Sequence, residues 1–431
     1  MVLLEKLLEI WSEENKPFLV DGSEELYFKQ VLTQDSQHLK SISTGDVVAV
    51  IGDFDAISIS NLLILFSRGA IVVPLTIDTQ IDHEYFFDSA LVDFVVKGSE
   101  VVKRRHSGSN ALIEQLRTIG HAGLVLFSTG TTGRPKAILH DFEYFLARFV
   151  TPRPSLTTLN FLLFDHIGGI NTLFHTLFNR GLVVAPSERT VESILATCKE
   201  FDVEVLPTTP TFLRMMLLSG MLDDNFPDCI RIITYGTERM DEPTLTALCE
   251  ALPLIDFRQT YGMSELGILR VKSLSRNSLF MKIGGEGVET RIVENVLQIK
   301  STSRMLGYLN AEYPFSMDGW YDTKDMIEYA DGYIKIVGRS NEVINVGGLK
   351  FMGSEVERMA LMMPGIKFAK ATAKPNPITG EHVELSVQLN SNSKLDKDDI
   401  KAYLGERLPT HMRPVRISLE SLKIGHRFKK M

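Results

Sequence analysis

An apolar run followed by hydroxyl residues, glycines and a lysine is the stretch of this sequence best suited to chemistry. Residues 124–127 have the composition of a buried strand, and Lys136 supplies a positive charge shortly after it. Glycines after a strand let several backbone N–H groups converge on one anion, and neighbouring hydroxyls add donors. The stretch therefore predicts a loop that holds a polyphosphate. Its hydroxyl and glycine positions are Ser128, Thr129, Gly130, Thr131, Thr132 and Gly133.

A P-loop of the Walker type is disfavoured, because that loop needs Gly-Lys-Ser/Thr in sequence. Here Pro135 precedes the lysine and Ala137 follows it. The alternative for the whole stretch is a polar surface turn.

A second stretch, Gln-Thr-Tyr-Gly-Met-Ser-Glu at 259–265, combines four residue types that suit a nucleotide. The ring of Tyr261 can stack on a purine, and Gly262 lets the backbone come close to a ligand. Ser264 can bond a phosphate, and Glu265 is a hard oxygen ligand for Mg²⁺. The alternative is an ordinary junction between a strand and a loop.

A third stretch, 318–325, is rich in Asp and Gly and ends at Asp325. Asp331-Gly332 follows between two alternating segments, which predicts a β-hairpin that ends near Arg339. A surface turn is again the alternative for 318–325.

The three stretches, in this order, resemble the signatures of the AMP-forming adenylating enzymes. These are the acyl-CoA synthetases, the adenylation domains of peptide synthetases and the luciferases, and the chain is most similar to a short acyl-CoA or acyl-acid ligase. The resemblance implies that residues 128–136 hold the β,γ-phosphates of ATP and that Tyr261 packs on adenine. It implies that Asp325 and Arg339 hold the ribose, although Lys324 replaces the usual glycine beside that aspartate.

The resemblance also implies catalytic roles for Lys136 and Glu265, the latter as the ligand of Mg²⁺. The family's catalytic lysine near the C-terminus corresponds best to Lys429, with Lys430 and Lys423 as rivals. A solvated basic tail is the alternative there. The family's hinge between two domain arrangements falls at Asn341.

Two further segments resemble parts of the family's acyl pocket. The turn Tyr235-Gly236-Thr237 follows an apolar strand and would line the adenine and acyl site. His166 stands where an aromatic or histidine gates the pocket, although a lone histidine is more often structural. Asp165 leaves open an amino-acid substrate, since amino-acid-activating members use an aspartate nearby to bind the substrate ammonium.

Strand, helix and strand over residues 46–75 form a βαβ unit, because two β-branched runs flank a segment of helical spacing. Residues 1–45 are expected to form a small N-terminal unit with a strand at 18–20 and a helix at 24–39. The fold class is α/β, with a large N-terminal domain of βαβ subdomains and a small β-rich subdomain. A small mobile α+β C-terminal domain follows, so the domains are 1–340 and 341–431.

The composition is that of an ordinary soluble protein, with 431 residues, 44% hydrophobic, 23% charged and a net charge of −8. Nothing in this balance marks a nucleic-acid or membrane-surface binder. The three cysteines show no metal-type spacing and read as thiols of a reducing compartment. No run is long enough to span a bilayer, so a cytoplasmic protein without a transmembrane segment is expected.

The expected function is an ATP-dependent ligase that forms an acyl-adenylate and pyrophosphate, then transfers the acyl group to a thiol. ATP and Mg²⁺ are the implied cofactors, a small carboxylic acid the substrate, and CoA or a phosphopantetheinyl carrier protein the acceptor. An amino-acid-activating enzyme of the same fold and a nucleotide-binding homologue without catalysis are the alternatives.

Overall fold

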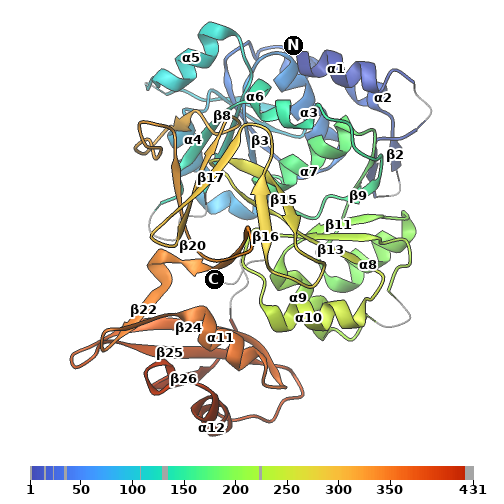
Figure 1. The fold of residues 1–431 in the computed structure, drawn as a ribbon. Coiled ribbons are helices and arrows are strands. Elements are labelled where there is room, and N and C mark those ends of the chain that lie inside the picture. The colour runs from blue at the N-terminus through green and yellow to red at the C-terminus, as the bar shows by residue number, and fades with distance from the viewer. Residues whose placement is uncertain are drawn as a thin grey trace.

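The computed structural model describes residues 2–13, 16–22, 24–33, 36–106, 108–128, 134–222 and 226–422. Within these residues the strands form four sheets (Figure 1). Three sheets lie in the part of the chain before residue 340, and the fourth is built by residues 343–419.

The first sheet has the order β19-β8-β7-β4-β3-β5-β6. Parallel strands β3, β4 and β7 are apolar along their length and almost wholly buried, as expected for strands covered on both faces. The βαβ unit predicted at 46–75 is confirmed, with Asp55 capping its helix α3. The strands are β3 (Val47–Ile51), β4 (Ile71–Leu75), β5 (Phe94–Lys97), β6 (Glu100–Lys103), β7 (Gly123–Phe127), β8 (Ala137–Asp141) and β19 (Gly307–Tyr308).

The second sheet has the order β13-β12-β11-β9-β10-β1-β2 and is parallel except at β1–β2. The carboxyl ends of β11, β12 and β13 therefore meet at one edge. The strands are β1 (Leu19–Asp21), β2 (Glu24–Leu26), β9 (Thr157–Leu159), β10 (Leu182–Ala185), β11 (Val205–Thr208), β12 (Ile232–Tyr235) and β13 (Asp256–Gln259).

The third sheet is antiparallel, with the order β14-β15-β16-β21-β20-β18-β17. Asp331 and Gly332, both with positive φ, form the predicted hairpin between β20 and β21. The strands are β14 (Tyr261–Met263), β15 (Gly267–Ser273), β16 (Met281–Gly284), β17 (Val288–Val293), β18 (Val296–Ser301), β20 (Tyr321–Ala330) and β21 (Tyr333–Arg339).

The fourth sheet runs β23-β22-β25-β24, and β26 pairs with β25. Its apolar core draws only on residues from Ile344 onward, which supports a separate C-terminal domain; the boundary at 341 stays a prediction. The elements are β22 (Val343–Val346), β23 (Leu349–Met352), α11 (Gly353–Leu361), β24 (Ile366–Asn376), β25 (Gly380–Leu389), α12 (Lys397–Arg407) and β26 (Arg416–Leu419).

The helices before residue 340 form layers around the first two sheets (Figure 1). Helices α1, α3, α6 and α7 share the core between these sheets. Helices α4 and α5 cover the other face of the first sheet, and α8, α9 and α10 the other face of the second. Their bounds are α1 (Val2–Ile10), α2 (Phe28–Thr33), α3 (Ala56–Ser67), α4 (His83–Ala90), α5 (Ala111–Ile119), α6 (Phe142–Leu146), α7 (Ile167–Phe178), α8 (Val191–Glu200), α9 (Pro210–Leu218) and α10 (Glu242–Ala251).

The helix predicted over 24–39 is wrong. Residues Glu24–Leu26 instead form β2, which pairs with β1 around the turn at Gly22, and α2 follows only from Phe28. The N-terminal segment is not a separate unit either. Strand β1 pairs with β10, and the indole N–H of Trp11 donates to the carbonyl of Leu177 in α7 (3.1 Å).

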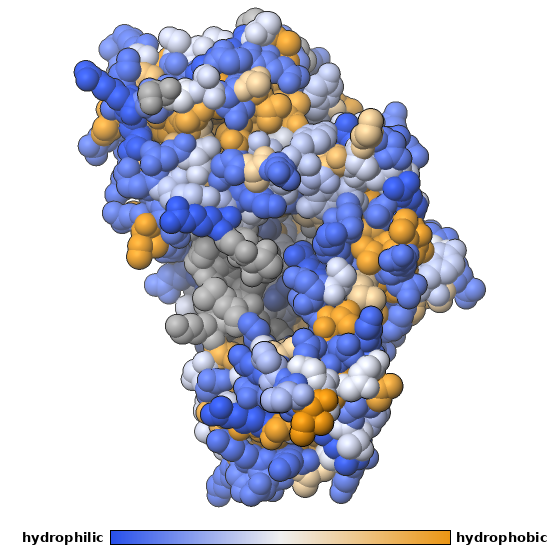
Figure 2. Space-filling view, turned by 90° about the vertical axis from the view of Figure 1, so that its left-hand side faces the viewer, coloured by the Kyte–Doolittle hydropathy of each residue, from blue (hydrophilic) through white to orange (hydrophobic). Residues whose placement is uncertain are grey.

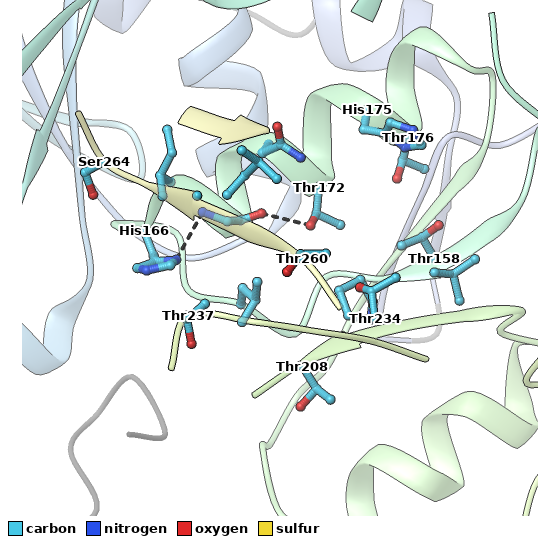
Figure 3. A pocket seen from close by; sticks show the side chains of 18 of the residues that line it. Thr158, His166, Thr172, His175, Thr176, Thr208, Thr234, Thr237, Thr260 and Ser264 are labelled. Carbon is cyan, nitrogen blue, oxygen red and sulfur yellow. Dashed lines mark hydrogen bonds between the residues drawn. The ribbon is translucent and has the colours of Figure 1, made fainter. Parts of the chain in front are cut away.

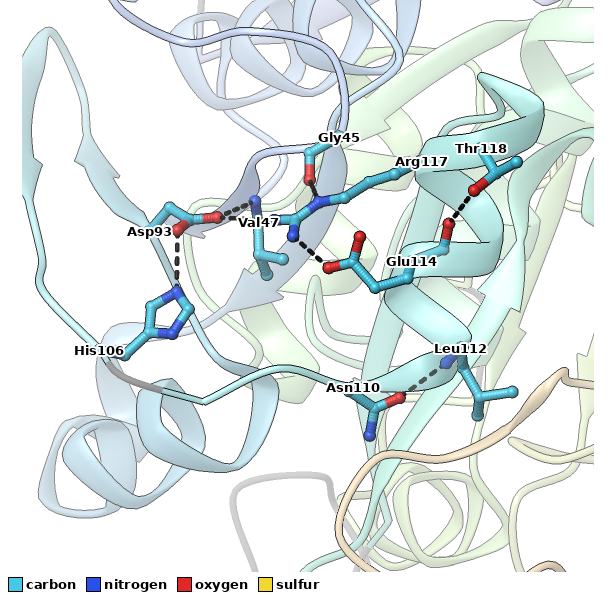
Figure 4. A network of polar contacts seen from close by, with 9 residues as sticks. All are labelled: Gly45, Val47, Asp93, His106, Asn110, Leu112, Glu114, Arg117 and Thr118. Carbon is cyan, nitrogen blue, oxygen red and sulfur yellow. Dashed lines mark hydrogen bonds and ion pairs between the residues drawn. The ribbon is translucent and has the colours of Figure 1, made fainter.

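A polar network fastens α5 to the start of β3 (Figure 4). The Asp93 carboxylate accepts from the Val47 N–H (2.8 Å), and its other oxygen bonds His106 (2.8 Å). Arg117 of α5 donates to the carbonyl of Gly45 (2.9 Å) and to Glu114 (2.7 Å). The network lies at the amino-terminal ends of β3 and β5, whereas the phosphate-loop segment follows the carboxyl end of β7.

The face seen in Figure 2 is mostly hydrophilic, with apolar side chains in small separate groups. Within the described ranges, no helix has the length and apolar character needed to cross a membrane.

Candidate active site

A cavity of about 370 Å³ lies between α7 and the strand ends of the second sheet (Figure 3). His166, Thr237 and Ser264 lie toward one side of it, and Thr158, His175 and Thr176 toward the other. Seven residues predicted for the site line the cavity, namely Ser128, His166, Thr237, Gly262, Ser264, Glu265 and Arg339. The structure thus brings together segments as far apart in sequence as Ser128 and Arg339.

The antiparallel pair β7–β8 brings the two ends of the predicted phosphate loop together. The Ser128 N–H donates to the Lys136 carbonyl (3.0 Å), and the Lys136 N–H donates to Ser128 Oγ (3.0 Å). Thr129, Gly130, Thr131, Thr132 and Gly133, for which phosphate contacts are predicted, lie outside the described residues.

Lys136 and Glu265 are joined through Tyr308 of β19. The Lys136 Nζ lies over the Tyr308 ring, 4.7 Å from its centroid, and the Tyr308 hydroxyl donates to Glu265 Oε1 (2.8 Å). Burial, and then the Glu265 carboxylate, raises the pKa of Tyr308, so the hydroxyl stays a donor. Pairing of β19 with β8 places the ring there.

The segment that carries Ser264 is fixed to β8 by a buried histidine. His140 Nε2 donates to the Ser264 carbonyl (2.7 Å), and because a carbonyl only accepts, the proton is on Nε2. Burial lowers the pKa of His140 to about 3, so the ring is neutral at pH 7.

Glycine is required where this segment turns back. A Cβ at Gly262 would lie 2.6 Å from the Gly267 carbonyl oxygen, so no other residue fits there without movement. Gly262 therefore lets the backbone of residues 267–268 pack closely against it. The residue also lines the cavity, as its predicted approach to a ligand requires.

Asp325 is not among the residues that line the cavity, but it contacts Arg339, which is. Both oxygens of its carboxylate have a partner. The Tyr261 hydroxyl donates to Oδ2 (2.5 Å), and Arg339 Nε lies 3.3 Å from Oδ1. Burial raises the pKa of Asp325, although Tyr261 and Arg339 oppose the shift. Arg339 lines the cavity.

Tyr261 is not among the cavity-lining residues. Its side chain is 9% exposed and belongs to the core of the third sheet, where it presents its hydroxyl to Asp325. The contact with adenine predicted for it stays a prediction, and the structure adds a role in orienting Asp325.

The turn after β12 contributes one of its three predicted residues to the cavity. Thr237 lines it with a φ of +71°, which is uncommon for a residue other than glycine. Tyr235 is buried in the core beneath the second sheet, and a Cβ at Gly236 would overlap the Thr260 side chain. Tyr235 and Gly236 therefore pack against neighbouring residues of the protein, and neither is among the residues that line the cavity.

His166 caps α7, since its Nδ1 accepts from the Gly168 N–H (3.0 Å), and it lines the cavity (Figure 3). Asp165 is 3% exposed and is not among the lining residues. Asn341 is exposed in a short 3₁₀ turn (Ser340–Glu342) between β21 and β22. Lys429, Lys430 and Lys423 lie outside the described residues.

Two features of the site were not predicted from the sequence. The contact between Tyr308 and Glu265 was not predicted, because it joins residues 43 positions apart in the sequence. One face of α7 was also missed, although its polar residues recur at helical spacing, at Asn171, Thr172, His175, Thr176 and Asn179.

Known proteins resemble this chain in part of its sequence and in its whole fold. The family model described as "AMP-binding enzyme" matches residues 119–296. The fatty acid–[acyl-carrier-protein] ligase MmaC of Mycobacterium marinum is 28% identical over 306 residues, which cover 61% of this chain and 57% of that protein. The 2-succinylbenzoate–CoA ligase of Enterococcus faecalis is 26% identical over 345 residues, which cover 74% of this chain and 69% of that ligase. The chain thus spans little more than half the length of MmaC.

Solved structures share the fold over nearly the whole chain. The ATP-bound structure of MatB from Rhodopseudomonas palustris has a TM-score of 0.79 at 16% identity and covers 99% of this chain and 96% of its own. The o-succinylbenzoate CoA synthetase MenE of Bacillus subtilis, in complex with its acyl-adenylate OSB-AMP, has a TM-score of 0.81 at 18% identity with the same coverage. The predicted α/β fold class is therefore confirmed. Residues 119–296 thus match the AMP-binding enzyme family, and nearly the whole chain shares the fold of MatB and MenE.

Proposed function

We propose that this protein is an ATP-dependent carboxylic acid ligase that forms an acyl-adenylate and then transfers the acyl group to a thiol. The observation that carries the proposal is the convergence of three distant segments on one cavity, through Ser128, Ser264–Glu265 and Arg339. The adenylate-bound and ATP-bound neighbours of the same fold support it.

In the first half-reaction, a carboxylate oxygen of the acid attacks the α-phosphorus of ATP. The bond to the bridging oxygen breaks, and pyrophosphate leaves. In the proposed arrangement the segment 128–136 holds the departing phosphates, and Lys136 offsets their charge. Asp325 and Arg339 hold the ribose, and Tyr261 keeps Asp325 oriented.

Glu265 suits a magnesium ion, because it is a carboxylate that lines the cavity and its orientation is fixed by Tyr308. Magnesium in nucleotide sites commonly takes one or two protein carboxylates, with phosphate oxygens and water for the rest. When bound, the ion would neutralise charge on the phosphates.

In the second half-reaction, a thiol attacks the acyl carbon of the mixed anhydride, and AMP leaves. The relatives named above include a carrier-protein ligase and a CoA ligase, so both CoA and a phosphopantetheinyl carrier protein are candidate acceptors. Incubation with ATP, acid and each acceptor, followed by mass spectrometry of the thioester, identifies which is used.

ATP–pyrophosphate exchange with a panel of carboxylic acids tests the first half-reaction. Asp325→Asn and Glu265→Gln are expected to lower exchange about 100-fold, because each removes a charge from the groups proposed to hold the ribose or the metal. Glu289→Gln, an exposed change on β17, is the matched control and should leave exchange intact. Unchanged thermal melting of the variants separates loss of chemistry from loss of fold.

Two other outcomes would favour the alternatives. Exchange with amino acids alone would favour amino-acid activation, although Asp165, the residue that suggested it, does not line the cavity. ATP binding without exchange on any acid would contradict the proposal and favour a non-catalytic homologue.

A further inference from the structure

The part of the cavity built by α7, β11 and β12 carries a set of hydroxyl, amide and imidazole side chains beside apolar ones such as Ile167 and Val205. We call the polar residues of this set the polar wall. Helix α7 supplies four of them at positions i, i+1, i+4 and i+5, which share one face of a helix. Strands β11 and β12 supply the other two from the opposite side (Figure 3). The polar wall consists of Asn171, Thr172, His175, Thr176, Thr208 and Thr234.

Two threonines of the polar wall bury hydroxyls that have no partner within the described residues. Thr176 and Thr208 are 3% and 1% exposed, and neither Oγ1 makes a hydrogen bond there. A buried hydroxyl without a partner is costly. Rotation about Cα–Cβ exchanges Oγ1 with the methyl group, so a ligand hydroxyl in the cavity can supply the missing partner.

The polar wall offers hydrogen bonds without charge. Among the described residues that line the cavity, the charged ones are Glu265 and Arg339, which come from the nucleotide-side segments. Burial, and then the positive charge of Arg153, lowers the pKa of His175, so its imidazole is neutral at pH 7. A tail that bears a carboxylate or an ammonium finds no counter-charge on these six residues.

We propose that the acid activated at this site is a hydroxylated carboxylic acid with a neutral tail that hydrogen-bonds to the polar wall. The inference rests on the proposed function. A plain alkyl tail would cover the polar wall without giving the buried hydroxyls of Thr176 and Thr208 a partner, and that deficit opposes its binding. The proposal thus separates this chain from relatives named as fatty acid ligases.

Matched pairs of acids test the inference in ATP–pyrophosphate exchange with the full chain. Octanoate is compared with ω-hydroxyoctanoate, and hexanoate with gluconate, its polyhydroxylated counterpart of equal carbon number. We expect kcat/KM to be at least about fivefold higher for one hydroxylated member than for its plain partner, as one satisfied hydrogen bond would give. Equal or faster exchange with both plain acids would overturn the inference while leaving the proposed ligase activity intact.

Isosteric variants assign the preference to the polar wall. Thr208→Val and Thr234→Val remove a hydroxyl and keep the side-chain volume, so we expect them to abolish the preference for the hydroxylated acid. Thr118→Val, an exposed change on α5, is the matched control. A preference that survives in both polar-wall variants would refute the assignment.

A binding measurement keeps this test independent of catalysis. If no acid supports exchange, the proposed function fails, and calorimetry of octanoate and ω-hydroxyoctanoate with the ATP-loaded protein then decides the tail preference. Tighter binding of ω-hydroxyoctanoate supports the polar wall as its recognition surface. Tighter or equal binding of octanoate rejects it.

Discussion

Tyr308 is a positioning residue for two proposed catalytic groups at once. Its ring lies beneath the Lys136 ammonium and its hydroxyl bonds Glu265. Tyr308→Phe keeps the ring and deletes the hydroxyl. We expect a roughly tenfold fall in pyrophosphate exchange with a higher magnesium requirement, because Glu265 loses one hydrogen bond to a charged group.

The magnesium dependence distinguishes positioning from a general loss of structure. Tyr329→Phe, on an exposed tyrosine of β20, is the matched control and should change neither quantity. An unaltered magnesium titration in Tyr308→Phe would contradict the role assigned to the hydroxyl.

Lys324 occupies a backbone position that suits glycine. Its φ is +62°, at the irregular pairing between β18 and β20, where one strand carries extra residues. Bulges of this kind commonly place glycine at the left-handed position, which costs other residues about 1 kcal/mol. Lys324 keeps the turn all the same, since its N–H donates to the Asp322 carboxylate (3.0 Å).

Lys324→Gly should therefore raise the free energy of unfolding by roughly 0.5 kcal/mol, after the entropy that glycine loses on folding. Lys324→Val should lower it by about 1 kcal/mol or more, because a β-branched side chain fits this φ poorly. Urea unfolding of both variants measures the difference. Equal stabilities would show that φ at this position does not limit the fold.

At the scale of elements, His140 links the first sheet to the third. Its neutral ring holds the Ser264 carbonyl, and its folded pKa of about 3 lies well below the ordinary 6.5. The unfolded chain therefore binds a proton that the folded chain does not. Stability from this residue is complete above pH 6.5 and falls by about 1.4 kcal/mol per pH unit as the pH drops toward 3.

His140→Gln keeps a donor for the Ser264 carbonyl but does not titrate. We expect the wild-type protein to lose stability more steeply than this variant between pH 7 and 5, by urea unfolding at each pH. Parallel pH profiles for the two proteins would mean that His140 is protonated without penalty.

Local pattern predicted the elements whose partners are close in sequence. The unit 46–75 and the hairpin at Asp331-Gly332 follow from runs, spacing and turn residues within one short segment. The helix predicted over residues 24–39 was wrong at its start, because residues 24–26 form β2 by pairing with β1. Strand β1 in turn pairs with β10. Pairing between residues as far apart as Leu19 and Val183 leaves no local pattern.

The same contrast applies to the site. Ser128, Gly262, Ser264 and Glu265 were predicted from short motifs whose chemistry is local, and Arg339 from the resemblance to a family. The structure places all five along one cavity. The polar wall was not predicted, because its threonines come from strands and a helix that only the fold brings together. The polar spacing along α7 was the available signal.

At the scale of the whole molecule, Arg214 holds the C-terminal sheet against the second sheet's helices. Its guanidinium is largely buried on α9 and donates to the carbonyls of Lys367 (2.5 Å) and Ile366 (3.0 Å) at the start of β24. It also donates to Thr244 of α10 (2.7 Å). Two domains that exchange arrangements at Asn341 would have to break these bonds.

Arg214→Met fills similar space and removes all three donors, so the arrangement seen here should become less populated. We expect faster hydrogen exchange in β24 and α11, a larger radius of gyration by X-ray scattering, and slower adenylation. Thioester formation from preformed acyl-adenylate should be slowed less, because that step would use the other arrangement. Arg407→Met, an exposed change on α12, is the matched control. An unchanged scattering profile with unchanged exchange in β24 would show that other contacts, such as those between α10 and α11, hold the domain without Arg214.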